Sequence, residues 1–202
     1  KMTIRALLLI SFVSLCPGSI TAQPLDSLRH LLEGINDTGL SYRRHVMKTI
    51  QKYGASSSQM DSLNNLIIHF DKESLVTVTA IIEKYGWLGK SQVGYNGNKA
   101  IFFTIQHSEI KYMDKYLPLL KKSARQGESD KGDVALMIDR IRVSYNKPQL
   151  YGTQYTYNEK EGKYNIYPIK DIKHVNNRRK SVGLNPLEES FEAGNYTILQ
   201  KY

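Results

Sequence analysis

Polar side chains that could bind a ligand or transfer a proton lie inside strongly apolar segments of this sequence. His107 ends KAIFFTIQH (99–107), which is otherwise almost entirely apolar. Asp139 and Arg140 lie within DVALMIDRIRV (133–143), where apolar residues cover nearly the whole helical wheel. An isolated buried charge is costly, so we expect these groups either to be paired or to serve a site.

A further polar segment, DIKHVNNRRKSVG (171–183), turns an arginine toward the interior. Arg179 falls on the same helical face as Ile172, whereas Arg178 falls off its edge. An inward arginine needs an acceptor, and Asp139 is the candidate that the sequence offers. We therefore predict that Arg179 and Asp139 meet.

The Tyr-rich stretch NKPQLYGTQYTYNEKEGKYNIYPI (146–169) interrupts the helical pattern. Its alternation and its short Gly-containing loop predict a small β-hairpin near 150–168. The preceding QLYGTQ contains Gly152, which favours a bulge or turn. We expect this shaped loop to bring Gln149, Tyr151 and Gln154 together.

Three functions fit these residues, and the first is favoured narrowly over the second. The first is the binding of a small polar or anionic molecule derived from the cell envelope, with arginines and glutamines as donors and tyrosines as flat walls. Its candidate residues are Arg140, Gln149, Tyr151, Gln154 and Arg179. The second is a metal-independent hydrolase or transferase, with His107 as general base and Asp139 orienting it. In the third, the polar residues form only an internal network that fixes helix packing.

Metal and cofactor sites are not expected. The five histidines (30, 45, 69, 107 and 174) are scattered and do not share a helix face, which argues against zinc. GKS at 89–91 lacks the earlier glycine of a phosphate-binding loop, because position 84 is Lys. We therefore expect no metal and no cofactor.

The first 22 residues have the pattern of a secretory signal peptide: a basic start, an apolar run (ALLLISFVSL) and small residues up to Ala22. Lipid attachment at Cys16 is less favoured, because Leu15 precedes it where a small residue is needed. We expect residues 23–202 to form one exported domain, periplasmic or extracellular, without a membrane-spanning segment. Export makes nucleic acid an unexpected partner despite the net charge of +9. The oligomeric state is left open.

The elements that must position these side chains are mostly helices, so the predicted fold class is mainly α, a multi-helix bundle with a small hairpin. We expect short helices at 24–35 and 41–53 separated by NDTG (36–39). We expect a longer helix to begin at 56–58 and to end at Gly86, with a possible division at Asp71. A Gly-rich connection (87–99) and helices near 109–125, 131–145 and 171–182 follow. The run at 100–105 fits either a helix or a strand.

Several short motifs occur in an order and spacing that resemble an uncharacterised bacterial family, a domain of unknown function. The resemblance covers roughly 70–190 and extends more weakly from 36. It implies a grouping of the candidate site residues but no activity. Leu88, Ser74 and Leu40 stand where that family usually has Pro, Asn and Gln. The motifs are YGW (85–87), VG (93–94), QH (106–107), YLPLL (116–120), DR (139–140), QLYGTQ (149–154) and RR-x3-GL (178–184).

Overall fold

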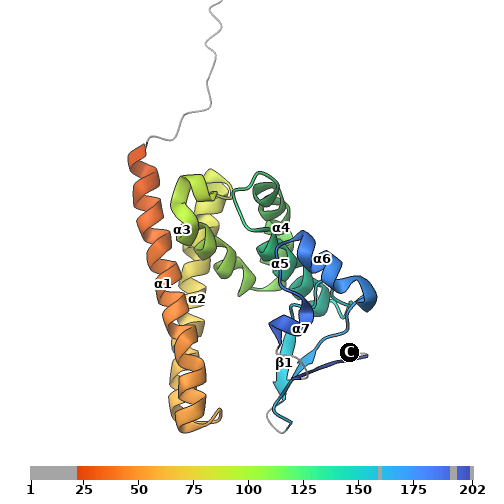
Figure 1. The fold of residues 1–202 in the computed structure, drawn as a ribbon. Coiled ribbons are helices and arrows are strands. Elements are labelled where there is room, and N and C mark those ends of the chain that lie inside the picture. Colours follow the sequence, from red (N-terminus) through yellow and green to blue (C-terminus); the bar gives the residue numbers. More distant parts are fainter. Residues whose placement is uncertain (1–21, 159–160, 192–194, 201–202) are drawn as a thin grey trace, which may run out of the picture.

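The computed structural model describes residues 22–158, 161–191 and 195–200, which are mainly α-helical, as the sequence predicts. Figure 1 shows α1, α2 and α3 grouped on one side, and the short C-terminal elements on the other, with α4 and α5 between them. No helix in the described ranges is both long enough and apolar enough to cross a membrane. The elements are α1 (Ala22–Tyr53), α2 (Ser58–Tyr85), α3 (Lys90–Gln106), α4 (Ile110–Arg125), α5 (Lys131–Ser144), β1 (Tyr155–Asn158), β2 (Lys163–Ile166), η1 (Ile172–His174), α6 (Val175–Ser181), α7 (Leu187–Ser190) and β3 (Tyr196–Ile198).

Helix α1 is continuous, so the prediction of two helices separated at 36–39 is wrong. Asn36 and Gly39 turn inward instead and are buried. A Cβ atom on Gly39 would lie only 3.1 Å from Cε1 of Phe70 in α2. The glycine thus lets α2 approach closely, and this packing outweighs the weak helix propensity of the segment.

Helix α2 begins after Ser57, whose Oγ accepts a hydrogen bond from the Met60 backbone N–H at 3.2 Å. It runs through Asp71 without a break. It ends at Gly86, which has a φ of 77° and confirms the predicted stop.

Helix α3 contains the run at 100–105, which is therefore helical. The helix begins at Lys90, inside the stretch predicted to be a Gly-rich connection. Gly94 (φ 72°) kinks its first part. Residues 97–106 are buried on nearly every side, which explains the absence of a polar face in this part of the sequence.

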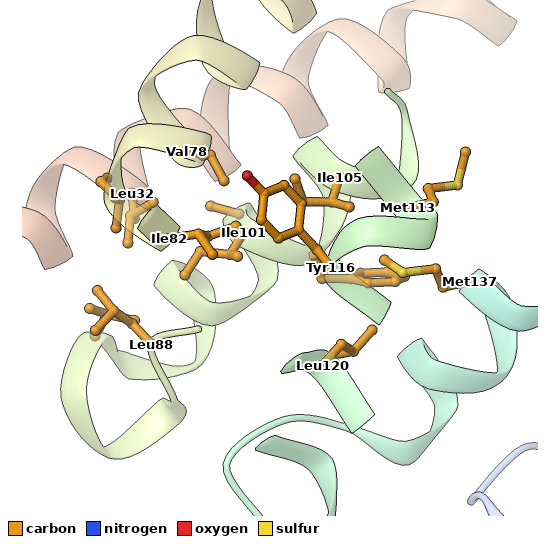
Figure 2. Packing of buried hydrophobic residues seen from close by; sticks show 14 of the residues in the cluster. Leu32, Val78, Ile82, Leu88, Ile101, Ile105, Met113, Tyr116, Leu120 and Met137 are labelled. Carbon is orange, nitrogen blue, oxygen red and sulfur yellow. The ribbon is translucent and has the colours of Figure 1, made fainter. Parts of the chain in front are cut away.

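The main hydrophobic core surrounds α3, as Figure 2 shows. Ile101 and Ile105 of α3 are fully buried at its centre. Side chains from α1, α2, α4 and α5 close around them, namely Leu32, Val78, Ile82, Met113, Tyr116, Leu120 and Met137. The C-terminal end of α3, which carries His107, is therefore held by the largest apolar cluster.

The small sheet confirms the predicted hairpin, because β1 pairs antiparallel with β2 and Tyr155 lies opposite Ile166. A third strand, β3, adds to β2 in parallel and was not predicted from the sequence. Ile166 packs with Val175, Leu187 and Phe191 in a second, smaller core. This core fixes the C-terminal elements against the 149–154 loop.

Candidate functional site

Asp139 of α5 anchors the loop at 149–154. The residue is fully buried, and its carboxylate accepts hydrogen bonds from the backbone N–H groups of Leu150 (2.6 Å), Tyr151 (3.0 Å) and Thr153 (3.1 Å). The Thr153 hydroxyl donates a further bond at 3.1 Å. Burial raises the pKa of Asp139, and the hydrogen bonds from the loop counteract part of this rise.

Arg179 of α6 holds the carbonyl side of the same loop. Its Nη1 donates to the Tyr151 carbonyl at 2.7 Å, and its other nitrogens donate to the Asn185 carbonyl and the Ser190 hydroxyl, both at 2.5 Å. In the described part of the chain, Arg179 and Asp139 form no ion pair. Both side chains point inward, as expected from the sequence. They do not contact each other, because both bind the loop backbone, Asp139 at the Tyr151 N–H and Arg179 at the Tyr151 carbonyl.

Gln149 and Arg178 complete the support of the loop. Gln149 is fully buried, and its side-chain Nε2 donates to the carbonyls of Gln154 (3.0 Å) and Tyr167 (2.8 Å). Arg178 Nε donates to the Leu150 carbonyl at 2.7 Å. Four of the seven candidate residues, Asp139, Gln149, Tyr151 and Arg179, thus take part in holding the loop.

The other three candidates, His107, Arg140 and Gln154, line one surface groove of about 360 Å³. It lies between the end of α3, the middle of α5 and the start of β1. The remaining walls are mostly apolar and come from Phe102, Phe103, Gln106, Leu136, Thr153 and Tyr155. A charged and polar end beside an apolar wall is the usual composition of a small-molecule site.

Arg140 is the only arginine of the groove, and it is half-buried without a carboxylate partner. Its Nε donates to Gln154 Oε1 at 3.2 Å and its Nη1 donates to the Gln106 carbonyl at 3.2 Å. No acidic side chain among the described residues lies within salt-bridge distance, and Nη2 has no protein partner there. Burial, followed by repulsion from Arg43, lowers the pKa of Arg140.

Gln106 adds a second unsatisfied group to the groove. The side chain is 3% exposed, and its Nε2 donates a long bond of 3.5 Å to the Leu136 carbonyl. Its Oε1 has no partner among the described residues. A buried amide oxygen left in this state is destabilising, so the groove carries polar groups that the fold does not use.

His107 lies between the positive charges of Arg43 and Arg140. The residue is exposed to solvent, yet the surrounding protein desolvates its ring, and this desolvation and the two arginines lower its pKa from 6.5 to about 4. Part of the residue reaches solvent, while protein fills much of the wider shell around the ring. His107 is therefore neutral at pH 7, and it makes no hydrogen bond to Asp139, whose carboxylate is taken up by the loop.

A small cavity of about 60 Å³ lies on the other side of His107, between α1, α2 and α3. Arg43 of α1 crosses to α2 there, and its Nη2 donates to both carboxylate oxygens of Asp71 at 2.9 Å. Asn36 and Thr104 also line the cavity. His107 and Phe103 face both the cavity and the groove.

Reasoning from the sequence missed Asn36, Arg43, Asp71 and Gln106 as part of this region. Asn36 belongs to the stretch predicted to separate two helices, and Gln106 belongs to the QH motif. Arg43 and Asp71 are polar residues in the middle of helices, and 27 intervening positions hide their pairing. A polar residue on the inward face of a long helix is the signal that could have found them.

The residues of the groove and cavity do not include a metal-binding cluster. Within residues 22–158, 161–191 and 195–200, no group of three or more His, Cys, Asp or Glu side chains is placed to hold a metal ion.

Comparison with known proteins gives one match. No curated protein and no solved structure matches the chain. The family described as "Family of unknown function (DUF6624)" matches residues 46–196, which include α2 to α6, the loop and the groove residues. This confirms the family resemblance; the match begins in the part where the resemblance is weaker, after residue 36, and ends a little beyond 190. The chain belongs to the DUF6624 family, whose function is unknown.

Proposed function

We propose that the protein binds a small polar anion in the groove formed by His107, Arg140, Gln154 and Gln106. The observation that carries this proposal is the state of Arg140, a half-buried guanidinium whose partners among the described residues are neutral oxygens. A charge in this position is stabilised when a carboxylate or another anion binds beside it. The unused N–H groups on Nη2 can donate to such an anion.

The surroundings of Arg140 favour an anion with an apolar or mixed body. His107 is neutral at pH 7, so the positive charge for the anion comes from Arg140. Phe102, Phe103 and Tyr155 supply flat apolar walls. A small carboxylate with a short carbon chain fits both requirements.

Titration of the protein with hexanoate, followed by NMR or calorimetry, tests the proposal. Hexanoate should bind, and Arg140→Gln should weaken binding about 10- to 100-fold, because hydrogen bonds to a charged group are lost. Arg142→Gln is the matched control. Arg142 lies on the same helix and donates to the Pro148 carbonyl outside the groove, so this variant removes the same charge and should bind like the wild type.

Two results would contradict the proposal. One is the absence of any saturable hexanoate binding by the wild-type protein. The other is equal weakening by both arginine variants, which would mean that only the net charge of +9 attracts the anion.

Residues 1–22 are proposed to be a signal peptide and 23–202 one exported domain, with a ligand derived from the cell envelope. The support is the basic, apolar and small-residue order of the leader, which falls almost entirely outside the described residues. Comparing the mass of the protein secreted by its host with that of the full chain tests this proposal. The alternative of His107–Asp139 catalysis gains no support, because the two side chains make no hydrogen bond.

A further inference from the structure

Asn36 is a buried amide that the fold does not use. It lies in the middle of α1 and is 6% exposed. Its buried Oδ1 has no hydrogen-bond partner in the described part of the chain. Buried side-chain amides are normally satisfied, because an unpaired one costs about 1–3 kcal/mol. Asn36 lines the cavity of about 60 Å³ beside His107, which places this unsatisfied amide next to empty space.

The other groups of the cavity indicate which chemistry would satisfy Asn36. The charges of Arg43 and Asp71 already neutralise each other through two hydrogen bonds of 2.9 Å. A further ion would disturb this pair, whereas a neutral group would not. The Asn36 amide and the Thr104 hydroxyl can each donate and accept, which matches a hydroxyl group. The volume admits a small polar group but not a whole ligand.

The cavity and the groove lie on either side of His107 and Phe103, which line both. We propose that the cavity is a hydroxyl-binding subsite of the groove, and that the ligand is a polyhydroxylated carboxylic acid. Its carboxylate lies at Arg140, and one of its hydroxyls reaches past His107 to Asn36 and Thr104. This inference rests on the proposed function for the carboxylate end only.

Three compounds of equal chain length separate the two ends. Gluconate has the carboxylate and the hydroxyls, hexanoate has only the carboxylate, and sorbitol has only the hydroxyls. We expect gluconate to bind the protein about tenfold more tightly than hexanoate, as one or two added hydrogen bonds allow. Sorbitol should bind more weakly than gluconate.

Substitutions in the cavity test whether the tighter binding of gluconate depends on its lining residues. Asn36→Leu removes the amide at similar volume and should reduce gluconate affinity to the level of hexanoate, without changing hexanoate affinity. Thr104→Val is a second, volume-conserving variant and should lower gluconate affinity about threefold, for the loss of a single neutral bond. Asn65→Leu, at an exposed position of α2, is the control and should bind all three compounds like the wild type.

The outcomes distinguish the inference from the proposed function. Equal binding of gluconate and hexanoate, with both lost in Arg140→Gln, would overturn the subsite and leave the anion site intact. Gluconate affinity that is unchanged in both Asn36→Leu and Thr104→Val would likewise mean that the cavity holds only water. If neither acid binds the wild-type protein, both proposals fail.

Discussion

At the scale of single residues, two inward arginines of this protein have different tasks. Arg179 donates to carbonyls and a hydroxyl that hold the chain together, whereas Arg140 is left without a counter-charge in an open groove. The sequence predicted that Arg179 turns inward and that Arg140, within an apolar helix, is either paired or part of a site. It could not distinguish their roles, since most partners of Arg179 are backbone carbonyls, which a sequence pattern does not identify.

The loop anchor predicts a large stability cost for Asp139→Asn. An amide has only one acceptor oxygen and adds donors that face the N–H groups of Leu150, Tyr151 and Thr153. We expect the free energy of unfolding to fall by about 2–4 kcal/mol in urea denaturation. Asp37→Asn, at an exposed position of α1, should stay within about 0.5 kcal/mol of the wild type. A change equally small at Asp139 would contradict its role as anchor.

The lowered pKa of His107 predicts a pH dependence of stability. The folded-state pKa of about 4 is below the unfolded value of 6.5, so between these pH values the unfolded chain binds a proton that the folded chain does not. The contribution of His107 is therefore present above pH 6.5 and is lost as the pH falls toward 4. NMR titration of the ring protons should give a midpoint near 4. The midpoint should rise in Arg140→Gln, which removes one of the repelling charges, and a midpoint above 6 in the wild type would contradict the described environment.

Asn36→Leu is expected to stabilise the protein while weakening gluconate binding. The leucine replaces an unpaired buried amide with apolar atoms of similar shape, so thermal or urea unfolding should show a gain of about 1–2 kcal/mol. A gain in stability with a loss of binding is typical of residues retained for function. A destabilised variant would instead show that Asn36 supports the fold through ordered water.

At the scale of elements, the sequence predicted α4, α5, the hairpin and the Gly86 stop, because each has a local signal of period or turn chemistry. It divided α1 at 36–39 for the same reason: Asn, Asp, Thr and Gly favour turns in isolation. The contact of Gly39 with Phe70, far away in the sequence, reverses that preference. Long-range contacts also place β3 beside β2, and no local sequence pattern predicts this pairing.

Gly152 in the 149–154 loop has both an unusual backbone and no room for a side chain. Its φ is 68°, and an added Cβ would lie 2.8 Å from Ile169 Cδ1 and 2.9 Å from Leu187 Cδ1. Gly152→Ala should therefore lower the free energy of unfolding by about 2–4 kcal/mol through strain and overpacking together. Gly127→Ala is the control for strain alone, because Gly127 has a φ of 79° and no neighbouring atom within 4 Å. Similar losses in the two variants would show that the loop can open to admit a methyl group.

At the scale of the whole molecule, the folded unit begins before the family match. The match starts at residue 46, inside α1, yet the first half of α1 covers α3 and contributes the fully buried Leu32. A protein that starts at residue 46 should lose several kcal/mol of stability, because loss of one buried leucine alone costs about 2–5 kcal/mol. Urea unfolding and limited proteolysis of this truncation, compared with residues 23–202, would measure the loss. A truncation as stable as the longer chain would contradict the described packing of α1 on α3.

The way in which the 149–154 loop is held has a consequence for how this family can change. The peptide N–H and C=O groups of the loop form hydrogen bonds with Asp139, Arg178 and Arg179. These groups are the same whatever side chains the loop has. The backbone of Leu150 and Tyr151 is thus held by hydrogen bonds that do not involve their side chains. Substitutions there can alter what the loop presents to a neighbouring molecule while its path stays fixed, so relatives could diversify in what they recognise without rebuilding the scaffold.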